Sequence, residues 1–192
     1  MFRCSCSLIL FSFFSFATLA AEQPLTKWSL AVDFTSWQEQ LSITNGVVGD
    51  WGYANFTGDF LKLERERVFT EHHSSLAELN IGYGQTTATG AGGNLSYNVN
   101  NIGWTGAAAS YRYLYNWTDR VGISIGPILL ARQINLPSGA TNINANSGYG
   151  LNYGALFDFR GRLFDHIILA QSLGYLTVRA STFWSLGIVY GF

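Results

Sequence analysis

The chain has 192 residues and a net charge of −1, with 12% charged and 16% aromatic side chains. About a quarter of the residues in a soluble globular chain are usually charged, so this sequence lacks the side chains that normally cover a water-exposed surface. The near-neutral charge balance suggests neither nucleic acid nor an acidic membrane surface as a partner, and we expect no nucleic-acid partner. The length allows one domain, or two small ones.

The N-terminus has the features of an export signal. Arg3 is the single early positive charge, and an apolar region over residues 8–19 is followed by small residues up to Ala21. This region is shorter than the roughly 20 residues that a membrane-spanning helix needs, which favours a cleaved peptide over an anchor. We therefore expect residues 1–21 to be a signal peptide and residues 22–192 to form the mature domain.

Cleavage would remove both cysteines, Cys4 and Cys6, together with Arg3. The remaining chain would have 10 basic residues against 12 acidic ones, a net charge of −2. It would hold neither a disulfide framework nor a thiolate metal site.

Alternation of apolar and polar residues recurs along the mature chain, which is typical of strands with two different faces. In WSLAVDFTSW, for example, Trp28, Leu30, Val32 and Phe34 form an apolar row. Eight such segments follow in chain order: 27–38, 53–66, 74–87, 103–115, 120–133, 148–161, 166–178 and 182–192. Most are longer than the five or six residues usual in soluble proteins, and they match the nine or more that a tilted strand needs to cross a bilayer.

The connections between these segments differ in length. Long ones, rich in Gly, Asn, Ser and Thr, are predicted at 39–52, 88–102 and 134–147, and short ones at 67–73, 116–119 and 162–165, with a tight connection near Arg179–Ser181. Long loops at one end and short turns at the other are typical of bacterial outer-membrane barrels, with an even strand number and periplasmic termini. The sequence therefore predicts an all-β fold, an eight-stranded antiparallel transmembrane β-barrel.

The tryptophans fall near the ends of predicted strands or beside loops: Trp28, Trp37, Trp51, Trp104, Trp117 and Trp184. Because indole prefers the boundary between apolar and aqueous surroundings, we expect them at the membrane interfaces. The last segment has one apolar row, made of Trp184, Leu186, Ile188, Tyr190 and Phe192. We expect this row to face lipid, because the last strand must close on the first if no strand edge is left unpaired in hydrocarbon.

Three stretches carry a resemblance to a known family: SYRYLYNW at 110–117, GYGLNYGALFDF at 148–159 and STFWSLGIVYGF at 181–192. With them the chain resembles the small eight-stranded outer-membrane barrels of the OmpX/Ail and OmpA-domain type. The resemblance implies a location in the cell outer membrane, among its lipid and lipopolysaccharide. It also implies that the barrel assembly machinery recognises the C-terminal strand. These motifs specify architecture rather than function.

If the apolar rows face outward, the opposite faces give an interior with four acids and four bases: Asp33, Lys62, Glu64, Glu78, Arg112, Arg132, Asp158 and Arg160. This set could form a polar pathway for ions or a plug of ion pairs. We favour the plug, because the charges balance and because inward Ile128, Leu130 and Leu156 would obstruct water. Pro127 is expected to mark a bulge or a shift in pairing. Inward glycines are expected at Gly122, Gly126, Gly150, Gly154 and Gly187 to fit a narrow barrel.

One stretch suggests catalysis, EHHSS at 71–75. His72 and Ser74 would share a face of a strand, and a His–Ser pair is a feature of outer-membrane lipid A deacylases. Their predicted place at a periplasmic turn, and Ser75 where that family has Asn, argue against catalysis. His166 is interpreted as structural. We predict no catalytic residue, no cofactor and no metal site.

We therefore expect a non-enzymatic barrel that is closed to solutes, with extracellular loops for surface interaction or envelope integrity. An extracellular ligand bound by these loops is one expected partner. Segments 86–103 and 133–148 contain no charged residue, which makes the binding of polyanions improbable. Three alternatives stay open: a lipid A-modifying hydrolase, a small channel for hydrophobic compounds, and a soluble exported carrier barrel with its apolar rows turned inward.

Overall fold

The computed structural model describes residues 25–44, 49–92, 95–135, 144–145, 149–178 and 181–192; in 41–44, 49–52, 88–92, 95–101 and 144–145 it describes the backbone alone. The expected signal peptide, residues 1–21, lies outside the described residues and stays a prediction. Within the described part of the chain, no helix is long and apolar enough to cross a membrane.

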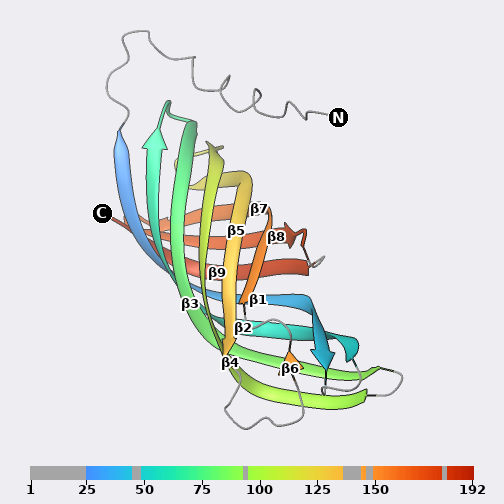
Figure 1. Cartoon of the computed structure of the whole chain (residues 1–192). Helices are drawn as coiled ribbons and strands as arrows, with labels where there is room; N and C mark the ends of the chain where they lie inside the picture. Colours follow the sequence, from blue (N-terminus) through green and yellow to red (C-terminus); the bar gives the residue numbers. More distant parts are fainter. Residues whose placement is uncertain (1–24, 45–48, 93–94, 136–143, 146–148, 179–180) are drawn as a thin grey trace, which may run out of the picture.

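The described residues form one antiparallel β-sheet that closes on itself (Figure 1). Its strands are β1 (Thr26–Thr44), β2 (Gly49–Val68), β3 (His73–Gly92), β4 (Leu95–Asn116), β5 (Val121–Asn135), β6 (Asn144–Ala145), β7 (Tyr149–Phe164), β8 (Ile167–Leu176) and β9 (Ser181–Gly191). Eight of them make the barrel wall, in the order β1-β2-β3-β4-β5-β7-β8-β9 and back to β1. Within the described residues, the two-residue β6 pairs with the end of β1 and with no other strand. The predicted eight-stranded antiparallel barrel is confirmed.

The two ends of the barrel differ. The predicted short turns are confirmed: β2–β3, β4–β5 and β7–β8 join at one end, which we call the short-turn end, within a few residues each. At the other end, the hairpin end, β1 pairs with β2 as far as Thr44 and Gly49. The pairing of β1 with β9 stops much earlier, at Trp37 and Phe183. Two hairpins, β1–β2 and β3–β4, thus extend beyond the β8–β9 side, and Figure 1 shows these long strands bending away from it.

The prediction of long loops at 39–52 and 88–102 is wrong, because most of both segments is paired strand. A strand can be recognised by alternation only where one of its faces is apolar and the other is polar. A hairpin that extends out of the bilayer can be polar on both faces, so its strands do not show this pattern. The segment 134–147 lies largely outside the described residues; its described parts are the end of β5 and β6. The tight connection near residue 180 likewise falls partly outside them.

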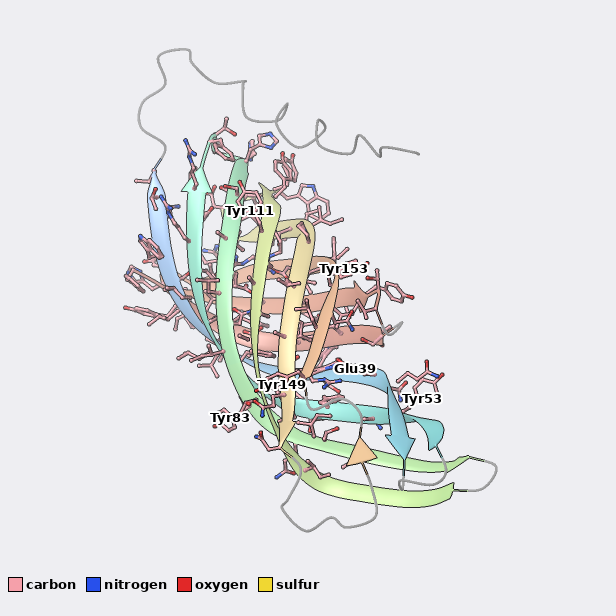
Figure 2. All side chains as sticks on the ribbon, in the orientation of Figure 1. Glu39, Tyr53, Tyr83, Tyr111, Tyr149 and Tyr153 are labelled. Atoms are coloured by element: carbon pink, nitrogen blue, oxygen red, sulfur yellow. The ribbon has the colours of Figure 1, made fainter. Side chains whose placement is uncertain are left out.

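The apolar rows face outward, as predicted. Leu79 and Ile81 on β3 are each 64% exposed, and Val32 on β1 is 58% exposed, although all three are aliphatic. Tyr83, Tyr111 and Tyr153 also lie on the outer wall (Figure 2). A soluble barrel would bury such rows, so the carrier-type alternative is contradicted. An apolar exterior around a charged interior is the arrangement of a barrel in lipid, so the fold is that of a transmembrane β-barrel.

Pro127 lies opposite β4, and the pairing of β4 with β5 is interrupted beside it. The pairs on either side, Ser110 with Ile128 and Tyr113 with Ile125, keep the same register. The expected bulge or shift is therefore wrong: the missing N–H of proline removes pairing locally without changing the alignment. The neighbouring Gly126 is required, because a Cβ there would overlap the backbone of Tyr111.

Candidate functional site

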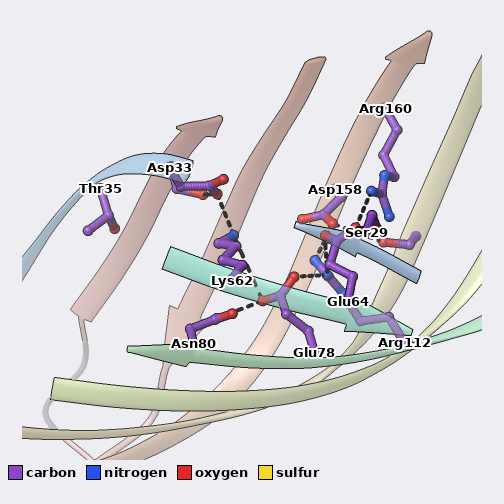
Figure 3. A network of polar contacts seen from close by, with 12 residues as sticks. Ser29, Asp33, Thr35, Lys62, Glu64, Glu78, Asn80, Arg112, Asp158 and Arg160 are labelled. Atoms are coloured by element: carbon purple, nitrogen blue, oxygen red, sulfur yellow. Dashed lines mark hydrogen bonds and ion pairs between the residues drawn. The ribbon is translucent and has the colours of Figure 1, made fainter. Parts of the chain in front are cut away.

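The barrel interior holds seven charged residues in one connected cluster, which we call the ionic network (Figure 3). They are Asp33, Lys62, Glu64, Glu78, Arg112, Asp158 and Arg160. All were predicted to face inward, and none is more than 6% exposed. They come from β1, β2, β3, β4 and β7, so the network joins strands that are distant in the sequence.

Arg112 is the central cation of the ionic network. Its Nη1 pairs with Asp158 and its Nη2 pairs with Glu78, so each nitrogen has its own carboxylate. Glu64 is a third, weaker partner, with its Oε1 3.9 Å from Nη2. Guanidinium suits this role because its fixed fork of donors can serve several acceptors at once.

Lys62 connects Arg112's acidic partner to the first strand. Its Nζ pairs with Asp33 and lies 3.8 Å from Oε1 of Glu78. Neutral groups add one hydrogen bond to each of these carboxylates: Ser185 Oγ donates to Asp33 at 3.0 Å, and Asn80 Nδ2 donates to Glu78 at 2.7 Å. Because β9 supplies Ser185, the network also spans the seam where the barrel closes.

Arg160 and Glu64 form the part nearest the short-turn end. Arg160 Nη2 donates to Glu64 Oε2 at 2.6 Å, and Ser29 Oγ donates to the same oxygen at 3.1 Å. A cavity of ≈ 380 Å³ opens here, lined by both residues and by residues of the short turns. The ionic network bounds this cavity on its inner side, so the barrel has at this end a cavity with charged residues at its base.

Beyond the ionic network, toward the hairpin end, five buried rings form a second layer, the aromatic layer: Trp37, Phe56, Phe60, Trp104 and Phe183. Trp37 stacks on Phe56 with centroids 4.8 Å apart, and meets Trp104 edge-on at the same distance. The N–H groups of both indoles form hydrogen bonds: Trp104 Nε1 donates to the Thr57 carbonyl at 3.0 Å, and Trp37 Nε1 donates to Glu39 Oε1 at 3.1 Å. Inward Ile128, Leu130 and Leu156 belong to the same buried cluster, as predicted.

The prediction that the tryptophans lie at the membrane interfaces is wrong for Trp37 and Trp104. Both continue an inward row of their strand: Trp37 follows Asp33 and Thr35 at two-residue spacing, and Trp104 is in step with Arg112. The alternation along each strand therefore places both side chains inside the barrel, and it outweighs the preference of indole for a membrane interface. Trp28 and Trp117 are exposed on the outside, as expected, and the Trp51 side chain lies outside the described residues.

A further ion pair lies next to the aromatic layer. Arg132 Nε donates to Glu39 Oε2 at 3.0 Å, and the guanidinium stacks over Phe56, 5.1 Å from its centroid. Arg132 was predicted to face inward. Glu39 was missed, because it was assigned to a loop that proves to be strand. Its two-residue spacing from Trp37 was the signal that could have placed it.

The EHHSS stretch does not assemble a His–Ser pair. His72 Nδ1 lies 3.0 Å from the Asn116 carbonyl, His73 Nδ1 pairs with the Tyr113 hydroxyl, and the Ser74 hydroxyl is buried without a partner. These contacts hold both rings at the short-turn end. His166 also lies there, with its ring against Tyr190. Among the described residues, no group of three His, Cys, Asp or Glu side chains could hold a metal ion.

No protein-family model matches the chain, and no curated protein sequence matches it. Among solved structures, it is similar to the outer membrane protein OprG from Pseudomonas aeruginosa, with a TM-score of 0.52, 11% identity, and coverage of 88% of this chain and 97% of that one. It also matches Ail, the attachment invasion locus protein of Yersinia pestis, with a TM-score of 0.47, 13% identity, and coverage of 89% and 100%. At 11% identity, the likeness to OprG shows the fold alone, which is that of a small outer-membrane barrel.

Proposed function

Since the chain folds as an eight-stranded outer-membrane β-barrel, we propose that it is a non-enzymatic barrel closed to solutes, which acts through its hairpin end in surface interaction or in envelope integrity. The observation that carries this proposal is the filled interior. An eight-stranded barrel has room only for side chains or one small ligand, and here two layers of side chains take that room.

The two layers oppose solutes by different means. An ion crossing the ionic network would have to separate buried pairs such as Arg112 and Asp158. Separation is costly, because no water is there to solvate the two charges once they are apart. A polar solute crossing the aromatic layer would lose its hydration between Trp37, Phe56 and Trp104. The filled interior therefore supports the proposal that these side chains stabilise the barrel and do not form a path for ions or polar solutes.

The hairpin end supports contacts with neutral partners. The β1–β2 and β3–β4 hairpins extend past the β8–β9 side, and the segments 86–103 and 133–148 have no charged residue. Neutral polar and aromatic groups suit sugars or weakly charged protein surfaces. They do not suit polyanions, which need clusters of basic residues. Contact with lipopolysaccharide around the barrel would use the same groups.

Conductance in planar bilayers tests the closed barrel. We expect the purified, refolded protein to give no reproducible steps, and a Trp37→Ala/Trp104→Ala/Arg112→Ala variant, which weakens both layers, to leak. Trp28→Ala/Trp117→Ala/Arg65→Ala is the matched control, because these three side chains are outside the barrel. Stable conductance steps from the unaltered protein would contradict the proposal.

The role of the hairpin end is tested separately in cells. Shortening β1–β2 between residues 41 and 52 should reduce adhesion or serum survival while the barrel still assembles. If neither property changes, surface interaction is excluded and envelope integrity is the remaining role, measured as sensitivity of the cells to detergent and bile salts.

A further inference from the structure

On the part of the outer wall whose side chains are described, one polar side chain lies within the apolar surface, Gln171 on β8. Along β8 its outward neighbours are Leu169 and Leu173, and across the sheet it is paired with Phe159 on β7 and Leu186 on β9. Gln171 itself is exposed. The amide is therefore surrounded by hydrocarbon side chains on all four sides.

No other amide or charged side chain on the described outer wall is placed in this way. Asp59 has Thr57 beside it on β2, and Gln133 has Asn135 beside it on β5, so both lie at the edge of the apolar surface. Arg65 is followed by Arg67 and stacks on Trp28 near the short-turn end. These groups can reach the aqueous boundary, whereas Gln171 is enclosed.

The position of Gln171 along β8 places it near the middle of the bilayer. It lies four positions along the strand from Ile167 at one end and four positions from Tyr175 near the other. Four residues of strand span about 13 Å, or about 10 Å of depth at the usual tilt, within an apolar band about 25 Å tall. A glutamine side chain is too short to reach either boundary, and the amide has no hydrogen bond within the described residues.

Lipid chains cannot satisfy this amide, because they offer neither donor nor acceptor. We propose that a second copy of this chain packs against the β7–β8–β9 face, so that the two Gln171 amides hydrogen-bond to each other. The amide carries both a donor and an acceptor, so it is complementary to itself. A two-fold axis brings identical residues together, as such a pair needs.

The surroundings of Gln171 suit this contact. Its neighbours on the same face are Phe157, Phe159, Leu169, Leu173, Leu186 and Ile188, all exposed. A different membrane protein would need its own amide at the same depth, whereas a second copy supplies one without further assumption. The inference goes beyond the proposed function and does not depend on what the hairpin end contacts.

Disulfide cross-linking in native outer membranes tests the proposal, because the chain has no cysteine after Cys6. We expect Leu169→Cys, which lies beside Gln171 on β8 and leaves its amide in place, to form a dimer of twice the chain mass on mild oxidation. Leu79→Cys is the matched control: it is exposed in the apolar surface of β3, on the opposite side of the ring of strands, and should stay monomeric. The heat-modifiable mobility of folded barrels confirms that both variants assemble.

A second pair of variants tests the amide itself. Leu173→Cys, with Gln171 intact, should also cross-link, and adding Gln171→Leu should lower the dimer yield by roughly three- to fifteen-fold, the range for one polar contact between membrane segments. Equal yields with and without the glutamine would overturn the proposal. So would cross-linking of Leu169→Cys no greater than that of Leu79→Cys, or an adduct whose mass identifies a different protein.

Discussion

Arg112 on β4 pairs with Asp158 on β7 across an intervening strand, β5. The strand between them contributes as well, since Ser124 Oγ donates to Asp158 at 3.2 Å. Backbone pairing in a barrel joins only adjacent strands, so a side-chain link of this kind holds the cross-section together in a way that the sheet alone does not. This makes Arg112 the most informative residue for the stability of the barrel.

Replacing Arg112 by leucine should destabilise the barrel by about 3–5 kcal/mol, because Glu78 and Asp158 would be left buried without their cation. The free energy of unfolding can be measured by urea titration of the barrel refolded into lipid vesicles. Arg65→Leu is the control, because Arg65 is exposed on the outside and should cost at most about 1 kcal/mol.

The carboxylates themselves offer a second test of the same residue. Adding Glu78→Gln and Asp158→Asn to Arg112→Leu should recover much of the lost stability, because neutral amides do not need a buried cation. If the triple variant is no more stable than Arg112→Leu alone, unpaired charge is not the cause of the loss.

Trp104→Ala should destabilise the barrel by about 3–5 kcal/mol, the usual cost of removing a large buried ring. Trp117→Ala should have little effect, since this ring lies outside the wall. Fluorescence gives an independent readout: brominated lipids should quench Trp28 in a variant that keeps only that tryptophan, and should leave Trp104 unquenched in the equivalent variant. Strong quenching of Trp104 would place the ring in lipid and contradict the aromatic layer.

Gly126→Ala should impair assembly, because the added methyl group would overlap the backbone of Tyr111 and Arg112. Overpacking of this kind costs about 1–3 kcal/mol. Gly161→Ala is a matched control in the next strand of the wall, since a Cβ at Gly161 would meet nothing within 4 Å. The measurement is the fraction of heat-modifiable, folded protein in the outer membrane. Equal fractions for the two variants would show that β4 and β5 do not approach so closely.

The wall of the barrel could be predicted because lipid imposes a strict rule. Lipid favours apolar residues at the outward positions of a spanning strand, so Leu30, Val32 and Phe34 mark the outer side, and Asp33 between Val32 and Phe34 marks the inner side. The charged members of the ionic network follow from this alternation. Their pairing does not follow, because which acid meets Arg112 depends on strand tilt and register, which alternation leaves open.

The errors arose where that rule stops. Past Trp37 the strands extend out of the hydrocarbon, so both of their faces tolerate polar residues. Glu39 therefore resembles part of a loop in the sequence, although it continues the inward row of β1. For the same reason, the alternation does not show how far β3 and β4 extend. Trp37 and Trp104 were misplaced because a general preference of indole was given more weight than the spacing from their neighbours.

Spin labels placed in turn along β1, from Leu30 to Thr35, test most directly which side of the wall each row occupies. We expect labels at Leu30, Val32 and Phe34 to collide with oxygen dissolved in the lipid, and labels at Ala31 and Thr35 to be protected from both oxygen and a water-soluble relaxation agent. A period of two with labels at Leu30, Val32 and Phe34 protected and labels at Ala31 and Thr35 open to water would contradict the account, because the rows would then face the opposite sides of the wall.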